Sequence, residues 1–268
     1  MHRGLHGTAY TVFEGSPPEP IDVEILGVLR DAIGPGKDMI LARLMGSKSE
    51  YNGVVAGMSG SPVYVDGKLL GAIGYRIGQF TKQPIAGITP IQQMLEVLRS
   101  NKGNEIAYST ETVADNSGLQ NNISSVSDWL GGAGGALQPI ETPLVFDGFS
   151  PAAIHLFEQH LPSLGLTPVS GLGGASPDEV DPAPVVPGSA ISAIIVSGDF
   201  NMAATCTVTY VDPKRLLACG HPITRFGNIS LPMTKAVVVT TVASSLDPIK
   251  IINTTQTIGS FTQDRDSG

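Results

Sequence analysis

One hexapeptide in this sequence has the residue types and spacing of a nucleophilic serine: Gly57-Met58-Ser59-Gly60-Ser61-Pro62. A serine hydroxyl attacks a carbonyl only when a base takes its proton and hydrogen-bond donors stabilise the oxyanion. A glycine two positions before the serine lets the backbone turn, so the amides of Gly57 and Ser59 are the expected oxyanion donors. The alternative is a Gly/Ser turn between two strands, which is common in a chain with 32 glycines.

The base that this serine requires must come from the histidines, of which the chain has five: His2, His6, His155, His160 and His221. His221 follows an apolar strand and precedes a proline, so it is expected at a strand end. The other four lie near the N-terminus or on an amphipathic helix, where solvent-facing roles are usual, and His6 stays a reserve candidate because it lies near a predicted strand. We therefore predict that His221 is the general base, with a purely structural histidine as the alternative.

Other patterns that carry chemistry are missing from the sequence. It contains no His-Glu-x-x-His motif and no Cys-x-x-Cys pair, which are common spacings of metal ligands. No glycine-rich run stands between a strand and a helix, as phosphate-binding loops require. We therefore expect no metal and no cofactor.

The composition bounds the class of protein. With 268 residues, 41% of them hydrophobic, the chain can form two cores, and its 32 glycines and 20 prolines indicate many tight turns between short strands. A formal net charge of −8 without a Lys/Arg-rich run argues against a nucleic-acid partner. The apolar runs are much shorter than the roughly 20 residues that span a bilayer, so we expect no membrane span.

The elements that must position Ser59 lie in residues 1–100. Short alternating runs predict strands over residues 8–13, 21–25, 38–44, 62–65 and 69–73. A helix with one apolar face is expected from Pro90 to about Leu98, with Thr89 as its N-cap. This part of the chain is predicted to form a Ser-bearing β-barrel with a terminal helix.

The rest of the chain divides into two further parts. Residues 101–187 contain polar, glycine-rich and proline-rich stretches around one amphipathic helix, from Ser150 to about Leu161, and are predicted to be an insertion or linker. Residues 188–268 return to strand patterns and are predicted to form a His-bearing β-barrel. The expected fold is therefore all-β, with two barrels and a partly helical middle segment.

The two cysteines, Cys206 and Cys219, lie on either side of a strand–turn–strand pattern. That pattern places them near opposite each other, so a cross-strand disulfide beside His221 is one expectation. Two buried thiols are the other.

The hexapeptide and the residues after it resemble trypsin-like proteases, whose motif is Gly-Asp-Ser-Gly-Gly-Pro. In those enzymes a hairpin, a substrate-binding strand and a C-terminal helix follow the nucleophile in that order. The resemblance implies that Ile73, Gly74 and Tyr75 form the strand edge against which a peptide substrate pairs. Met58 stands where trypsin-like enzymes have an aspartate, so activation through a freed N-terminus is not expected.

A more specific resemblance is to the stage IV sporulation protein B (SpoIVB) family of serine peptidases. It is carried by Ile21-Asp-Val-Glu-Ile25, the Gly57–Pro62 motif, Thr207-Val-Thr-Tyr-Val-Asp-Pro213, Gly220-His221 and Thr257-Ile-Gly259. The resemblance covers two blocks, residues 1–98 and 190–268. It implies that Ser59 and His221 are the catalytic pair.

Two features depart from that family's founding member. There the His block precedes the Ser block, so this chain would be a circular permutation, which preserves a site that is defined by geometry. The sequence also lacks a PDZ module, so regulation by that route is not implied.

The acid that would orient His221 is left open by the resemblance. Asp264 follows His221 by 43 residues, a spacing usual in trypsin-like barrels, and is the candidate. Asp38 and Asp199, at strand ends, are alternatives. A Ser–His dyad helped by a backbone carbonyl or a water molecule is a third.

The sequence thus predicts a serine endopeptidase that acts on a protein or peptide. A catalytically silent two-barrel module for peptide binding or assembly is the main alternative. A second alternative is a domain that cleaves itself, for which residues 165–187 are the natural internal substrate. The family resemblance and the cysteine pair together predict an extracytoplasmic location, periplasmic or secreted.

Overall fold

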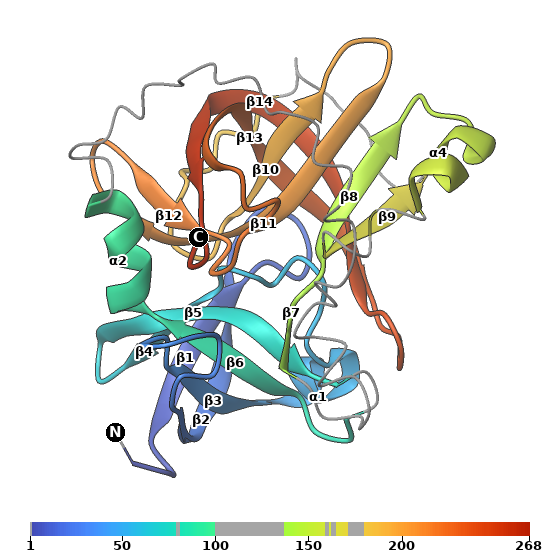
Figure 1. The fold of residues 1–268 in the computed structure, drawn as a ribbon. Coiled ribbons are helices and arrows are strands. Elements are labelled where there is room, and N and C mark those ends of the chain that lie inside the picture. Colours follow the sequence, from blue (N-terminus) through green and yellow to red (C-terminus); the bar gives the residue numbers. More distant parts are fainter. Residues whose placement is uncertain (1, 79–80, 100–136, 159–160, 162–164, 171–179) are drawn as a thin grey trace, which may run out of the picture.

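The computed structural model describes residues 2–78, 81–99, 137–158, 161, 165–170 and 180–268 (Figure 1). Two antiparallel-rich sheets account for most of them, one below the other in Figure 1. The described helices are short: α1 (Ser47–Asn52), α2 (Ile91–Arg99) and α4 (Pro151–Glu158).

The first sheet closes into a six-stranded barrel that carries the serine motif. Its strands follow the order β4-β1-β2-β3-β6-β5, and β5 pairs back with β4. Their bounds are β1 (His6–Thr11), β2 (Glu19–Leu29), β3 (Met39–Met45), β4 (Pro62–Val65), β5 (Lys68–Ile77) and β6 (Ile85–Pro90). A seventh strand, β7 (Leu137–Pro139), pairs with the free edge of β5.

Alternating burial explains why these segments form a barrel. Along β2, Ile21, Val23 and Ile25 are buried, and the residues between them are at least partly exposed. One face of each such strand therefore meets the others in a single apolar core, which also includes Met58 of the serine motif. The core thus supports the loop that carries Ser59.

The second sheet carries His221 beyond its short strand β12. It follows the order β14-β13-β10-β11-β8-β9, and β12 pairs with β11. The bounds are β8 (Thr142–Asp147), β9 (Leu166–Ser170), β10 (Ala190–Val196), β11 (Asn201–Val211), β12 (Leu216–Ala218), β13 (Gly227–Val242) and β14 (Ile249–Asp264).

The all-β prediction is confirmed: a closed barrel and a second sheet pack together, and the predicted helix follows the Ser barrel as α2. The described part of the middle segment, which was expected to be an insertion or linker, contributes β7 to the first sheet and β8, α4 and β9 to the second module. The limits of the two sheets therefore do not coincide with the predicted boundaries at residues 100 and 188.

Residues 100–136 and 171–179 of that segment lie outside the described residues. The strand order does not test the circular permutation, which stays a prediction.

Thr89 has a different role from the one predicted. The helix begins at Ile91, and the Thr89 hydroxyl donates a hydrogen bond of 2.6 Å to the carbonyl of Gly220 in the second sheet. Because Gly220 precedes His221, this bond joins the barrel to the histidine turn.

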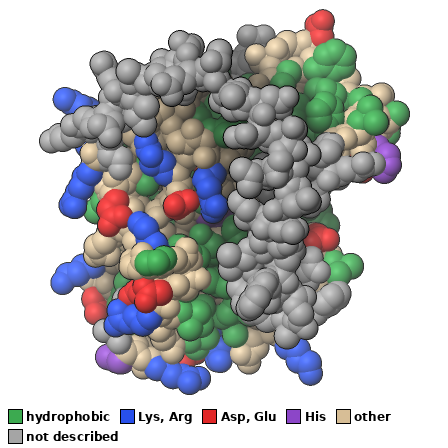
Figure 2. Space-filling model, in the orientation of Figure 1, with side chains coloured by type: hydrophobic (Ala, Val, Ile, Leu, Met, Phe, Trp, Pro, Cys, Tyr) green, Lys and Arg blue, Asp and Glu red, His purple; other side chains and the backbone are tan. Residues whose placement is uncertain are grey.

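Charges are mixed on the molecular surface. Among the described side chains visible in Figure 2, Lys/Arg and Asp/Glu are interspersed over the lower module. No helix in the described part of the chain is both long and apolar enough to cross a membrane.

Candidate active site

Ser59 lies at the end of a tight loop that passes between the two sheets. Gly57 and Gly60 flank it with φ of 95° and 96°, in the left-handed region that favours glycine. The Ser59 carbonyl accepts a 2.8 Å hydrogen bond from the Thr207 amide in β11. The Ser59 side chain is fully buried, and its hydroxyl has no hydrogen-bond partner among the described residues. A buried hydroxyl without a partner costs stability, and such groups are rare in native structures and occur at catalytic positions.

The loop fixes the two amides that were predicted to bind an oxyanion. The Met58 carbonyl accepts from both the amide and the hydroxyl of Ser61, at 3.0 and 2.6 Å. The Ala56 carbonyl accepts from the Lys250 amide, at 3.3 Å. In a trans peptide the N–H points away from the C=O, so the Ser59 amide points away from Ser61 and the Gly57 amide points away from Lys250. Neither amide donates to another described residue, so both are available as donors.

A buried lysine that was not predicted supports this loop. The Nζ of Lys250, in β14, donates to the Thr11 hydroxyl at 2.8 Å and to the Gly57 carbonyl at 3.3 Å. Its side chain is fully buried, and this burial lowers the pKa of Lys250 to about 7. The sequence signal was a lysine within the apolar run Ile249–Ile252, which is an unusual position for a charged residue.

The lowered pKa of Lys250 predicts a pH-dependent stability. The unfolded chain, where the pKa is near 10.5, holds the proton more tightly than the folded chain does. The contribution of Lys250 to the free energy of unfolding is therefore largest above pH 10.5, where Lys250 is neutral in both states. This contribution decreases as the pH falls and reaches its lower limit below about pH 7, where Lys250 is charged in both states. Relative to Lys250→Met, the wild type should gain about 1 kcal/mol of unfolding free energy per pH unit between pH 7 and 10.

Urea unfolding of both proteins at pH 6.5, 8 and 9.5 measures this difference. A difference between the two proteins that is the same at all three pH values would show that Lys250 keeps its ordinary pKa.

His221 lies immediately after β12 and is 2% exposed. Its Nδ1 is 2.7 Å from the Pro222 carbonyl, which can only accept, so Nδ1 carries the proton. In the neutral ring, Nε2 then has the free lone pair, and it has no partner among the described residues. Burial lowers the pKa of His221, against smaller raising effects of Pro222, Asp264 and Ile140. The ring is therefore neutral at pH 7, the state that a general base requires.

The structure brings the two sequence blocks into contact at this point. Gly220, the residue before His221, packs against Gly60, the residue after Ser59. A Cβ added to Gly220 would lie only 3.5 Å from the Gly60 amide nitrogen. The Thr207 hydroxyl donates 3.0 Å to the Gly57 carbonyl. Two buried side-chain atoms without partners, Ser59 Oγ and His221 Nε2, thus belong to adjoining turns of different sheets.

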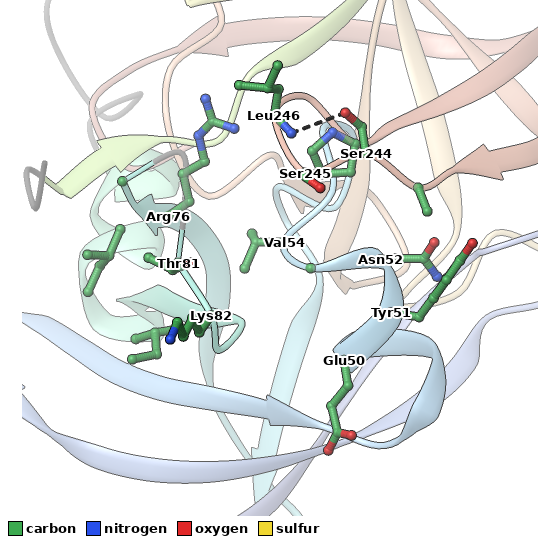
Figure 3. A pocket seen from close by; sticks show the side chains of 16 residues that line it. Glu50, Tyr51, Asn52, Val54, Arg76, Thr81, Lys82, Ser244, Ser245 and Leu246 are labelled. Atoms are coloured by element: carbon green, nitrogen blue, oxygen red, sulfur yellow. Dashed lines mark hydrogen bonds between the residues drawn. The ribbon is translucent and has the colours of Figure 1, made fainter.

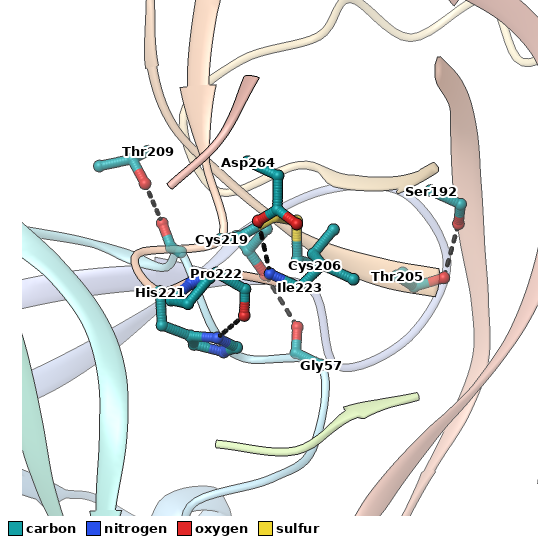
Figure 4. Close-up of a disulfide and its surroundings, with 12 residues drawn as sticks. Gly57, Ser192, Thr205, Cys206, Thr209, Cys219, His221, Pro222, Ile223 and Asp264 are labelled. Carbon is teal, nitrogen blue, oxygen red and sulfur yellow. Dashed lines mark hydrogen bonds between the residues drawn. A yellow bond between two sulfur atoms is a disulfide. The ribbon is translucent and has the colours of Figure 1, made fainter. Parts of the chain in front are cut away.

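A disulfide joins Cys206 and Cys219, with a Cα–Cα distance of 5.1 Å. It connects β11, which binds the Ser59 carbonyl, to the turn that carries His221 (Figure 4). Of the two states considered from the sequence, the structure shows the cross-strand bridge.

Asp264 is the acid suggested by spacing, and the structure places it under the turn that follows His221. Its carboxylate accepts hydrogen bonds of 2.6–2.7 Å from the amides of residues 223, 224 and 225 and from the Thr224 hydroxyl. In Figure 4 it lies across the Pro222–Ile223 segment from the His221 ring, which bonds to Pro222. This arrangement makes Asp264 a positioning residue for the histidine turn. Asp38, an alternative acid, pairs instead with Arg30.

This geometry predicts a moderate effect for Asp264→Asn. The amide group of asparagine cannot accept all four bonds, so the turn should loosen and the rate of Ser59 labelling by a fluorophosphonate should fall about 10-fold. An acid in direct contact with the histidine would be worth about 10⁴-fold. Asp264 raises the pKa of His221, so Asp264→Asn should lower that pKa. In a plot of labelling rate against pH, the fall on the acid side should then move to lower pH. A loss near 10⁴-fold would assign Asp264 the role of triad acid.

The predicted substrate edge adjoins the serine loop. Ile73 is fixed there, because its carbonyl accepts from the Gly60 amide at 2.7 Å and its amide donates to the Ser61 carbonyl at 2.9 Å. The Tyr75 ring meets the His221 ring edge-on, with centroids 6.3 Å apart. Beside His221 a cavity of about 670 Å³ extends along Pro139, Glu141, Thr167 and Arg225. A Cβ on Gly74 would lie 2.8 Å from the carbonyl oxygen of Gly220, the residue before His221, so Ile73, Gly74 and Tyr75 all adjoin the two turns that carry the candidate pair.

The described residues contain no cluster of three or more His, Cys, Asp or Glu that could hold a metal ion. The expectation that no cofactor is needed stays a prediction.

Comparison with known proteins gives one match. The model of the family described as SpoIVB peptidase S55 matches residues 3–95, which include the whole closed barrel and the serine motif. No curated protein and no solved structure matches the chain significantly. The match agrees with the resemblance seen in the sequence, and similarity to a peptidase family supports a peptidase that acts on proteins. Residues 3–95 of this chain are thus similar to the family described as SpoIVB peptidase S55.

Proposed function

We propose that this protein is a serine endopeptidase in which Ser59 is the nucleophile and His221 is the general base. The observation that carries the proposal is the pair of buried, unpartnered atoms, Ser59 Oγ and His221 Nε2, on adjoining turns. The family match supports a peptidase, and the neutral tautomer of His221 supports its role as the base.

In the proposed mechanism His221 Nε2 takes the proton of Ser59, and Ser59 Oγ attacks the carbonyl carbon of a peptide bond. The amides of Gly57 and Ser59 stabilise the oxyanion, and each such donor is worth roughly 3–4 kcal/mol of barrier. His221 then gives the proton to the leaving nitrogen, and water hydrolyses the acyl-enzyme. The Pro222 carbonyl holds the Nδ1–H, so it does part of what an acid does in a triad.

Self-processing and an extracytoplasmic location belong to the same proposal. A disulfide persists in oxidising compartments, which supports the periplasm or the outside of the cell. The self-cleavage site first suggested, residues 165–187, lies partly outside the described residues.

A second candidate is a catalytically silent peptide-binding or assembly module. The observation that favours it is the position of Asp264, whose carboxylate binds backbone amides rather than the His221 ring.

The test is covalent labelling with a fluorophosphonate probe, followed by mapping of the labelled peptide. Attachment at Ser59 would support the peptidase. A folded protein that stays unlabelled would favour the silent module.

A further inference from the structure

The edge strand predicted to bind substrate is already paired with a segment of the same chain. Strand β7 runs antiparallel to β5, with Arg76 opposite Gln138 and Tyr75 opposite Pro139. The next residue, Ile140, donates its amide to the Gly74 carbonyl at 2.9 Å. A peptide bound by strand addition would make the same main-chain bonds.

The side chains of this segment fit the positions that they occupy. Ile140 is fully buried and belongs to the apolar cluster that contains Val54, Met58 and Ile73, so its side chain fills a pocket beside the serine loop. Pro139 lies opposite Tyr75, and its missing N–H is tolerated because this strand is at the edge of the sheet.

The residues on either side of Ile140 border the candidate site. Pro139 and Glu141 line the same cavity as His221, and a backbone group of Ile140 raises the pKa of the His221 ring. Glu141 forms an ion pair with Arg76. Arg76 lines a second cavity, of about 440 Å³, between the barrel and the β13–β14 turn (Figure 3). Thr142 then begins β8 in the second sheet.

We propose that residues 137–140 occupy the substrate groove as the residues before a scissile bond, and that Ser59 cleaves the Ile140–Glu141 bond of its own chain. This inference rests on the proposed peptidase function. It also assigns the substrate class: peptides with a branched aliphatic residue after proline, cleaved on the carboxyl side of the aliphatic residue.

The reaction follows the mechanism above with Ile140 as the acyl group. Ser59 Oγ bonds to the Ile140 carbonyl carbon, the bond to the Glu141 nitrogen breaks, and His221 passes the serine proton to that nitrogen. Water then hydrolyses the ester, leaving a carboxylate on Ile140 and a free amine on Glu141. Neither oxyanion amide donates to Ile140 in this structure, so its carbonyl must turn toward them before attack.

Intact-mass analysis and N-terminal sequencing of purified protein over time test the inference. We expect two fragments that meet between Ile140 and Glu141, with a rate constant that does not change on 100-fold dilution because the reaction is intramolecular. Ile140→Val should cleave within about 10-fold of the wild-type rate. Ile140→Asp should be slower by about 100-fold or more, because its carboxylate cannot enter an apolar pocket cheaply.

Leu156→Asp, which places the same charge on a residue that is 73% exposed, is the matched control and should cleave normally. If Ile140→Asp does not fold, the position of the cleaved bond in the wild type tests the inference by itself. A chain that is labelled at Ser59 but stays intact, or that is cut elsewhere, would overturn this inference and leave the peptidase function standing. A chain that is neither labelled nor cut would overturn both.

Discussion

Ser59→Ala and His221→Ala should each abolish fluorophosphonate labelling and peptide-bond cleavage, with a loss of about 10⁶-fold in kcat. Loss of either member of a nucleophile–base pair costs about as much as loss of both, because the hydroxyl is unreactive without the base. Both side chains are buried. Ser59 Oγ has no partner among the described residues, and His221 has one, the Pro222 carbonyl that its Nδ1 binds, so each replacement by alanine removes at most one hydrogen bond. The folded state should therefore survive, and urea unfolding checks that it does.

The double variant provides a sharper measure. The fold loss of kcat in the double variant should equal the loss in either single variant, rather than the product of the two losses, because the two groups act as a unit. Ser47→Ala and His155→Ala, at exposed positions on the helices α1 and α4, are matched controls that should label normally. Labelling that survives in Ser59→Ala would mean that another residue is the nucleophile.

Gly60→Ala should destabilise the protein by about 4 kcal/mol or more, a range that overpacking and backbone strain can reach together. A Cβ at this position would overlap the Thr207 carbonyl oxygen and press on the Cys219 amide, and both of these are backbone atoms of the second sheet. The φ of 96° is also unfavourable for alanine. The two sheets would have to separate for the side chain to fit.

Gly53→Ala is the matched control for this prediction. Gly53 has a φ of 73°, and a Cβ there would meet nothing within 4 Å. Gly53→Ala should therefore cost only the strain of an alanine in the left-handed region, about 1–2 kcal/mol. Circular dichroism with urea titration measures both variants. Equal effects of the two substitutions would show that the contact between Gly60 and the second sheet contributes little to stability.

The sequence alone identified features that depend on short segments. Strand alternation in residues 21–25, the Gly57–Pro62 motif and the strand end before His221 are all local patterns, and the structure shows strands and a tight loop where they predict them. The cysteine pair was placed across a strand–turn–strand unit for the same reason, since a hairpin brings close neighbours in sequence together. The family match over residues 3–95 likewise rests on one continuous block.

Only the tertiary structure decided the roles of residues whose partners are distant in sequence. Lys250 meets Gly57 across 193 positions, and Asp264 meets the turn at residues 223–225 from about 40 positions away. The position of β7 on the edge of β5 was also not readable from its three residues, because any short extended segment can pair with an exposed strand edge. A local pattern gives a residue its secondary structure and its inward or outward direction. Which backbone groups it then meets depends on how the two sheets pack, and no local pattern contains that information.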